Sequence, residues 1–176
     1  MLKKKYKTLI IIPVYNEAKS IRNLVEEIRA LYSEIDLLVI NDGSTDASRR
    51  EAMRGGARVI SHVFNLGDGA ARQTGFIYAL RNGYNYLLHL DGDRQHSPGE
   101  IPTFLSILAD DQADLVVGSR FLGKCDYPLR WPRKLGMKLF SWICSAIIGI
   151  KITDPTSGFL SMDPKATQIY TDGYYP

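Results

Sequence analysis

Short apolar runs alternate with amphipathic segments along most of the chain. Runs rich in Val, Ile and Leu predict buried strands over residues 8–14, 36–41, 58–63, 86–90 and 114–118. Between them, apolar residues three and four positions apart, with capping and stop signals, predict helices over residues 18–32, 44–54, 68–81 and 97–108. This alternation predicts an α/β fold, in which a mostly parallel sheet carries helices on both faces.

The second half of the chain holds a predicted long loop, residues 121–133, and an apolar stretch, residues 139–152, that is too short to cross a bilayer. A helix over residues 131–148 would place apolar and aromatic side chains beside cations. The apolar set is Trp131, Leu135, Leu139, Phe140, Trp142, Ile143, Ile147 and Ile148, and the cations are Arg130, Arg133, Lys134 and Lys138. Such a helix either lies at a membrane surface or packs on the sheet, and the sequence leaves both open.

Composition narrows the class of protein. The 176 residues suit one domain, and 45% hydrophobic with 23% charged residues is typical of a soluble globular chain. A net charge of +3 is too small to indicate nucleic-acid binding. Cys125 and Cys144 stand in dissimilar contexts, so we expect no disulfide framework and a reducing, cytoplasmic location. The apolar run 9–12 is too short for a signal peptide.

Two carboxylates follow the strand predicted over residues 86–90. Asp91 and Asp93 stand at alternate positions, so both point to the same side of the strand's carboxyl end, where open α/β sheets bind ligands. Two such carboxylates repel each other unless a cation lies between them, and Mg²⁺ or Mn²⁺ accepts these oxygen ligands. Gln95, two positions further on, can add a carbonyl oxygen to the same ion.

The first two strands also end in polar residues. After Pro13, Tyr15 offers a flat ring and Glu17 an acceptor, which together could cradle a nucleobase, although Asn16 and Glu17 could instead cap the next helix. After the second strand, Gly43 permits a sharp turn, and Ser44 or Asp46 caps the following helix. We expect the Asp42 carboxylate to remain free for a ligand.

Three further features complete the candidate chemistry. Gly67 and Gly69 suit the approach of an anionic ligand to a helix N-terminus, and Arg72 in place of a third glycine argues against a dinucleotide site. Arg120 ends the fifth predicted strand, where its guanidinium either binds phosphate or pairs with an acid. Asp154 supplies another carboxylate, in a tight turn before Phe159.

Taken together, the segments 13–17, 41–46, 91–98, 118–120 and 154–159 resemble those of the inverting GT-A-fold glycosyltransferases of family 2. More narrowly, they look like dolichyl- or polyprenyl-phosphate sugar synthases. The resemblance implies a Rossmann-like GT-A fold and one catalytic domain over residues 1–176, which ends earlier than in relatives of this type. Asn41 stands where relatives more often carry Asp.

The resemblance also implies roles for individual residues. It assigns the sugar nucleotide to Pro13, Tyr15, Glu17, Asp42, Ser44, Gly67 and Asp91. It assigns Mg²⁺ or Mn²⁺, which would bridge the donor diphosphate, to Asp91, Asp93 and Gln95. The expected catalytic set is Asp91, Asp93, Arg120, Arg133 and Asp154, with the two arginines on phosphate.

The expected reaction is transfer of a sugar from a UDP- or GDP-linked donor to a polyprenyl phosphate, at the cytoplasmic face of a membrane. A phosphate acceptor with a second pKa of about 6 is largely ionised near pH 7 and needs no strong base, and attack opposite the leaving group inverts the anomeric carbon. One alternative is a glycosyltransferase with a glycan hydroxyl acceptor, which needs a base. Another is a non-catalytic module that binds sugar nucleotides. A nucleotidyltransferase is disfavoured, because segment 13–17 lacks the expected Gly-rich basic loop.

Overall fold

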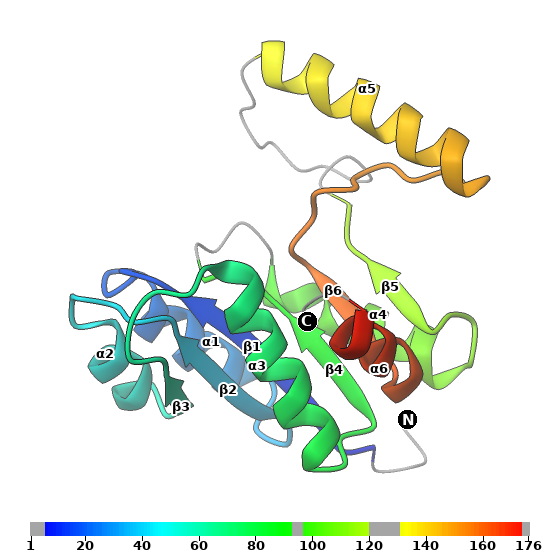
Figure 1. Cartoon of the computed structure of the whole chain (residues 1–176). Coiled ribbons are helices and arrows are strands. Elements are labelled where there is room, and N and C mark those ends of the chain that lie inside the picture. The colour runs from blue at the N-terminus through cyan, green and yellow to red at the C-terminus, as the bar shows by residue number, and fades with distance from the viewer. Residues whose placement is uncertain (1–5, 93–96, 120–130, 174–176) are drawn as a thin grey trace. The chain divides into compact units, whose positions relative to one another are not determined.

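The computed structural model describes residues 6–92, 97–119 and 131–173, and it contains a six-stranded sheet in the order β3-β2-β1-β4-β6-β5 (Figure 1). The strands are β1 (Thr8–Val14), β2 (Asp36–Asn41), β3 (Arg58–Ser61), β4 (Tyr86–His89), β5 (Leu115–Val117) and β6 (Leu160–Met162). Strand β1 pairs in parallel with β2 and β4, and β2 pairs in parallel with β3. The prediction of an α/β fold with a mostly parallel sheet is therefore confirmed.

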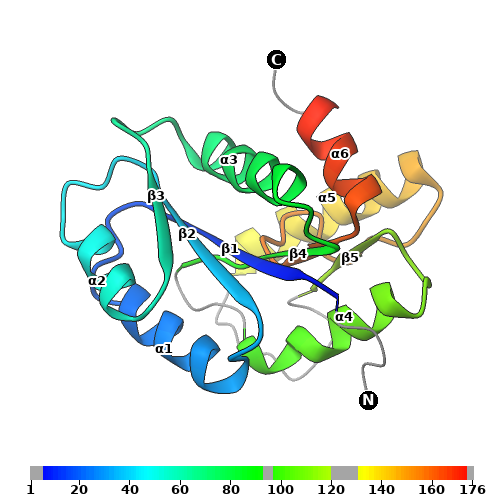
Figure 2. The ribbon, with the colours of Figure 1, turned by 90° about the horizontal axis from the view of Figure 1, so that it is seen from below.

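Helices cover both faces of this sheet, as predicted. They are α1 (Ile21–Leu31), α2 (Ser48–Arg54), α3 (Asp68–Arg81), α4 (Ile101–Ala109) and α6 (Pro164–Gly173), with a short 3₁₀ helix, η1 (Pro98–Glu100), before α4. Figure 2 shows α3 and α6 on one face and α1 and α4 on the other. Helix α1 buries Ile21, Leu24, Val25 and Ile28, which share one side of the helix because they are spaced three and four residues apart.

The core forms where α3 packs on the centre of the sheet. Leu9 and Ile11 of β1 and Leu38 of β2 are buried against Ala71 and Phe76 of α3. The approach is close at Gly75, because a Cβ built there would lie 2.7 Å from Ile11 Cδ1. A glycine at this position therefore lets the helix backbone lie directly over the central strand.

Two elements of the sheet region were not predicted. Strand β6 lies antiparallel to β4 and pairs Leu160 with His89, and α6 follows it. Three residues are too few to show a hydrophobic period, so β6 is defined by its partner strand and not by its own pattern. The second helix also begins later than predicted, at Ser48, because residues 42–47 form a loop whose side chains contact the loop after β1.

The chain divides into two compact units, Met1–Val116 with Leu160–Pro176 and Val117–Phe159. The second unit contains α5 (Trp131–Ile148). Ser145 Oγ accepts a hydrogen bond of 2.9 Å from the Ile152 N–H, which fixes the chain after the helix. Large apolar side chains of α5 are exposed: Leu139, Phe140, Trp142, Ile143 and Ile147. Among the described residues, no helix is both long enough and apolar enough to span a bilayer.

Gly43, in the loop after β2, lies close to the backbone of segment 64–65. Its φ is +66°, and a Cβ built there would lie 2.4 Å from the carbonyl carbon of Phe64 and 2.5 Å from the Asn65 nitrogen. Both the left-handed backbone and the contact with segment 64–65 therefore require glycine. Gly83 has nearly the same φ, +64°, but a Cβ there would meet no atom within 4 Å.

Gly83 is thus a matched control for Gly43. We expect Gly83→Ala to lower the free energy of unfolding by about 1–2 kcal/mol through backbone strain alone. Gly43→Ala should cost about 1–3 kcal/mol more, because the backbone of segment 64–65 must also move. Urea denaturation of both variants measures the difference, and equal losses would contradict a steric role for Gly43.

Candidate functional site

The loops after β1 and β2 are joined by hydrogen bonds at the carboxyl edge of the sheet. Asn16 adopts a left-handed φ of +58°, its N–H donates to Ser44 Oγ (3.0 Å), and its Oδ1 accepts from the Thr45 N–H (2.9 Å). Glu17 N–H donates to Ser48 Oγ over 2.7 Å. Asn16 therefore fastens the neighbouring loop, whereas the sequence suggested a cap for the next helix. The N-cap of α1 is Ser20.

Asp46 adds a second fastening between the same loops. Its Oδ2 accepts from the Ala18 N–H (3.1 Å), and its Oδ1 accepts from the Ser48 N–H (2.8 Å) at the start of α2. Desolvation alone would raise the pKa of the Asp46 carboxyl, but the hydrogen bonds from Ser48 and Ala18 outweigh it and hold the pKa below its ordinary value. The sequence predicted Ser44 or Asp46 as the cap of the second helix, but the N-cap position is Ala47, which makes no side-chain cap hydrogen bond, and Asp46 accepts from the first N–H of α2 from one residue further out.

The Asp42 carboxylate is occupied by protein donors. The residue is buried, its Oδ1 accepts from the Leu66 N–H (2.9 Å) and lies 2.7 Å from His62 Nδ1, and its Oδ2 accepts from the Gly67 N–H (2.8 Å). The prediction that this carboxylate remains free for a ligand is wrong. The donors come from a loop twenty or more residues further along the chain, and no local pattern at residue 42 indicates them.

His62 extends this network to α3, because its Nε2 lies 2.9 Å from Thr74 Oγ1. The loop that Asp42 holds, residues 62–67, ends in Gly67, which has a φ of +92° and is the N-cap of α3. Gly67 is therefore placed at a helix N-terminus, as the sequence predicted. His62 was missed, and its position directly after β3 was the available signal.

Tyr15, Glu17 and the end of β4 come together at this edge. The Tyr15 side chain is 48% exposed, while Pro13 is half-buried. Ser20 Oγ lies 2.8 Å from Glu17 Oε2 and 3.1 Å from the carbonyl oxygen of Gly92. A Cβ on Gly92 would lie 3.3 Å from the carbonyl oxygen of Pro13, so the chain after β4 runs close to the loop after β1. Ser20 was not predicted as a site residue.

Asp91 lies beside a cation at the end of β4. Its side chain is 30% exposed, and its Oδ1 lies 3.7 Å from Arg72 Nη2 and 3.9 Å from His89 Nε2. Arg72 also pairs with Asp68, Nη2 to Oδ2, over 2.7 Å. The sequence treated Arg72 only as a departure from a glycine motif. The spacing of Asp68 and Arg72, one turn apart on α3, was the signal for this ion pair.

A partly exposed carboxylate such as that of Asp91 is the donor type that Mg²⁺ and Mn²⁺ accept, so the described part of the predicted metal site fits such an ion. Asp93 and Gln95 lie outside the described residues. Within residues 6–92, 97–119 and 131–173, no three potential metal ligands of the His, Cys, Asp or Glu type lie together.

The remaining predicted site residues belong to the second unit. Arg120 lies outside the described residues, and Arg133 is in α5 without a described side chain. Asp154 is buried in a turn, where its Oδ1 accepts from the Thr156 N–H (3.3 Å) and from Thr156 Oγ1 (3.1 Å). The Phe159 N–H donates to Ser157 Oγ (3.2 Å), which continues the same turn. The tight turn around Asp154 is as predicted.

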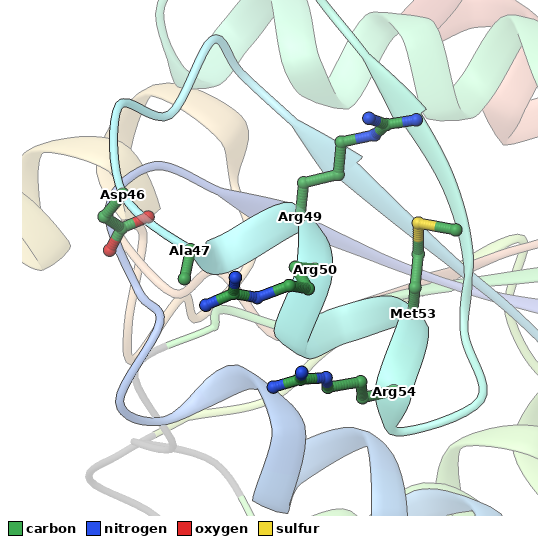
Figure 3. Close-up of a pocket in the computed structure, with 6 residues that line it drawn as sticks. All are labelled: Asp46, Ala47, Arg49, Arg50, Met53 and Arg54. Atoms are coloured by element: carbon green, nitrogen blue, oxygen red, sulfur yellow. The ribbon is translucent and has the colours of Figure 1, made fainter.

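An open cavity of about 810 Å³ lies over α2 and shares Asp46 with the edge just described. Figure 3 shows that its lining comes from α2 and the two residues before it: Asp46, Ala47, Arg49, Arg50, Met53 and Arg54. Arg54 pairs with Glu51 over 2.8 Å, and both arginine partners of Glu51 are more than half exposed. These contacts are those of a solvated helix face, so we place the candidate site at the strand ends.

The chain matches the family model described as "Glycosyl transferase family 2" over residues 9–168. It is 34% identical over 164 residues to the undecaprenyl-phosphate mannosyltransferase of Micrococcus luteus. This match covers 87% of this chain and 65% of that protein. It is 31% identical over 160 residues to the polyprenol monophosphomannose synthase of Mycolicibacterium smegmatis, covering 87% and 60%. The chain therefore spans less than two thirds of the length of each of these relatives.

Solved structures share the fold. The glucosyl-3-phosphoglycerate synthase of Mycobacterium tuberculosis, crystallised with Mn²⁺, UDP-glucose and phosphoglyceric acid, superposes with a TM-score of 0.72 at 21% identity. The match covers 93% of this chain and 59% of that one. The likeness confirms that the sheet and its helices form a GT-A architecture.

The buried Asp42 carboxylate should contribute strongly to stability. Asp42→Ala removes the acceptor of the Leu66 N–H, the partner of His62 Nδ1 and the shorter of the two hydrogen bonds from the Gly67 N–H, which also donates to Asn65 Oδ1, so we expect the free energy of unfolding to fall by about 2–4 kcal/mol. Asp110→Ala, at an exposed position after α4, is the control and should change it by less than about 0.5 kcal/mol. Chemical denaturation compares the two, and similar values would show that loop 62–67 is held by other contacts.

Proposed function

Because the chain belongs to glycosyl transferase family 2, we propose that it transfers a sugar from a nucleotide-diphosphate donor to a polyprenyl phosphate. The relatives from Micrococcus luteus and Mycolicibacterium smegmatis carry names of this reaction type, which supports the choice of acceptor. We further propose that residues 1–176 form one catalytic domain, in which the first unit binds the donor and the second unit serves the acceptor.

One observation carries the proposal for the donor. Ser20 connects Glu17 of the first strand's loop to Gly92 at the end of β4, so an exposed ring, an acidic acceptor and a strand-end carboxylate share one edge. Tyr15 would stack on a base, Glu17 would accept from its donor groups, and Asp91 would face the diphosphate. Pro13, Ser44 and Gly67 complete the proposed donor site, and Asp42 acts through the loop that it holds.

A divalent ion, Mg²⁺ or Mn²⁺, would be held by Asp91 together with Asp93 and Gln95. When bound, it supplies Lewis-acid neutralisation of the charge that develops on the departing nucleoside diphosphate. The chain's own side chains orient the reactants. Arg120 and Arg133 would bind phosphate oxygens, and Asp154, already fixed by Thr156, would orient the acceptor or the sugar.

The acceptor explains why no strong base is needed. A phosphate monoester with a second pKa of about 6 is largely dianionic near neutral pH and attacks the anomeric carbon directly. The bond from that carbon to the donor phosphate breaks on the opposite face, so the product is inverted.

The first test is a screen of UDP- and GDP-linked sugars with Mn²⁺ and a short polyprenyl phosphate, with product read by mass and anomeric configuration by NMR. We expect one donor to give an inverted product. Asp91→Asn should lower kcat/KM at least about 100-fold, because the ion that neutralises the diphosphate loses a charged ligand.

Asp110→Asn provides the control, since this exposed side chain lies after α4 and should leave kcat/KM unchanged. Full activity of Asp91→Asn would refute the proposed site. Donor binding without turnover by the unaltered chain would instead identify a binding module.

The exposed apolar side chains of α5 support a peripheral contact with the cytoplasmic face of a membrane, where a polyprenyl acceptor resides. Leu139, Phe140 and Ile143 accompany Trp142 and Ile147 on the solvent-exposed surface of this helix. Lys134 and Lys138 belong to the same helix and add positive charge to its sequence. An apolar surface with cations is typical of helices that lie in the headgroup region.

Ile147→Glu should weaken partition to vesicles that contain anionic lipid by about tenfold or more, because an exposed apolar side chain that would enter the headgroup region becomes a charge. Ile169→Glu, on α6, changes an isoleucine that is 63% exposed against 79% for Ile147, and it should leave partition unchanged. Co-sedimentation with liposomes measures both. Equal partition of the two variants and the unaltered protein would exclude α5 as the contact.

A further inference from the structure

We propose that Arg72 is a positioning residue that serves as the resident counter-ion of Asp91, and thereby makes divalent-cation binding dependent on the donor diphosphate. This inference rests on the proposed function, because it assigns a role to a residue beside the carboxylate expected to hold the ion. Nothing in the motifs at the strand ends required a cation at this position of α3.

The first support is the placement of the Arg72 guanidinium. Its Nη2 lies between two carboxylates, 2.7 Å from Asp68 Oδ2 and 3.7 Å from Asp91 Oδ1. The first distance is that of a charge-assisted hydrogen bond, whereas the second is too long for one. Arg72 is therefore tethered by Asp68 and acts on Asp91 through charge.

The second support is the unused donor capacity of the same side chain. Arg72 is 28% exposed, yet its Nε is buried and, among the described residues, has no hydrogen-bond partner. A buried donor without an acceptor is costly and rare in proteins. A guanidinium with a spare donor, near the edge proposed for a diphosphate, is suited to an anionic ligand.

The positive charge of Arg72 has opposite effects on the binding of the divalent cation and on the binding of the diphosphate. A divalent cation bound at Asp91 without the diphosphate is repelled by the guanidinium a few ångströms away. An incoming diphosphate brings negative charge that interacts favourably with both cations. Arg72 should therefore weaken binding of the ion alone and strengthen binding of the diphosphate with the ion, which is a coupling between two ligands.

The Asp68 carboxylate should have the opposite effect from Arg72 on cation binding, so that it favours the ion at Asp91. It neutralises part of the Arg72 charge, and its own side chain is 59% exposed at the first turn of α3. Its removal leaves the guanidinium charge to act more fully on Asp91. A purely structural role for the ion pair would instead make both single variants shift cation binding in the same direction.

The experiment measures Mn²⁺ binding by the EPR signal of the free ion, using the full chain without nucleotide, and then UDP and GDP binding by calorimetry at saturating Mn²⁺. Arg72→Gln should bind Mn²⁺ about 3–10-fold more tightly and the responding nucleoside diphosphate about 3–10-fold more weakly. Asp68→Asn should bind Mn²⁺ about 2–3-fold more weakly. Arg72→Lys keeps the charge and should stay near the unaltered protein in Mn²⁺ binding.

Arg22→Gln is the matched control, because Arg22 and Glu26 form an ion pair of the same spacing and the same 2.7 Å length on α1. It should change neither measurement. If Arg72→Gln and Asp68→Asn shift Mn²⁺ affinity in the same direction, or not at all, the role of Arg72 is overturned. If Asp91→Asn binds Mn²⁺ as the unaltered protein does, it is the proposed metal site that fails.

Discussion

A buried carboxylate with several protein donors holds neighbouring loops together at the carboxyl edge of the sheet. Asp42 follows β2, and it fixes a loop that belongs to β3 and α3 through two backbone N–H groups and His62. Such an acceptor is worth most when it is buried, because water cannot replace it. Gly43, the next residue, permits the backbone contact with segment 64–65 that this arrangement requires.

Hydrogen bonds between neighbouring loops also fix the rest of this edge. Asn16 and Asp46 join the first two loops, and Ser20 joins the first loop to the chain after β4. Each strand end is thus held by a neighbour and not by its own loop alone. A ligand that meets Tyr15, Glu17 and Asp91 meets groups whose backbone is already ordered, so less conformational entropy is lost on binding.

The sequence was sufficient for the elements that carry a long hydrophobic period. Helix α1 shows such a period, strand β1 is a continuous apolar run, and both were predicted within three residues. The sequence was insufficient for elements and contacts that depend on residues far away along the chain. Strand β6 owes its existence to β4, and the Asp42 carboxylate is saturated by residues that follow a different strand. The pairing of Arg72 with Asp68 was readable from spacing, but its distance from Asp91 depends on how α3 packs against β1.

The antiparallel strand β6 has a consequence for synthesis of the protein. Leu160–Met162 pairs with β4, while residues 118–159 are made between β5 and β6. During translation, the backbone edge of β4 therefore stays without this partner until the ribosome has released everything up to β6. We expect the nascent sheet to remain open along that edge, where chaperones or premature association would act, and to close only late in elongation.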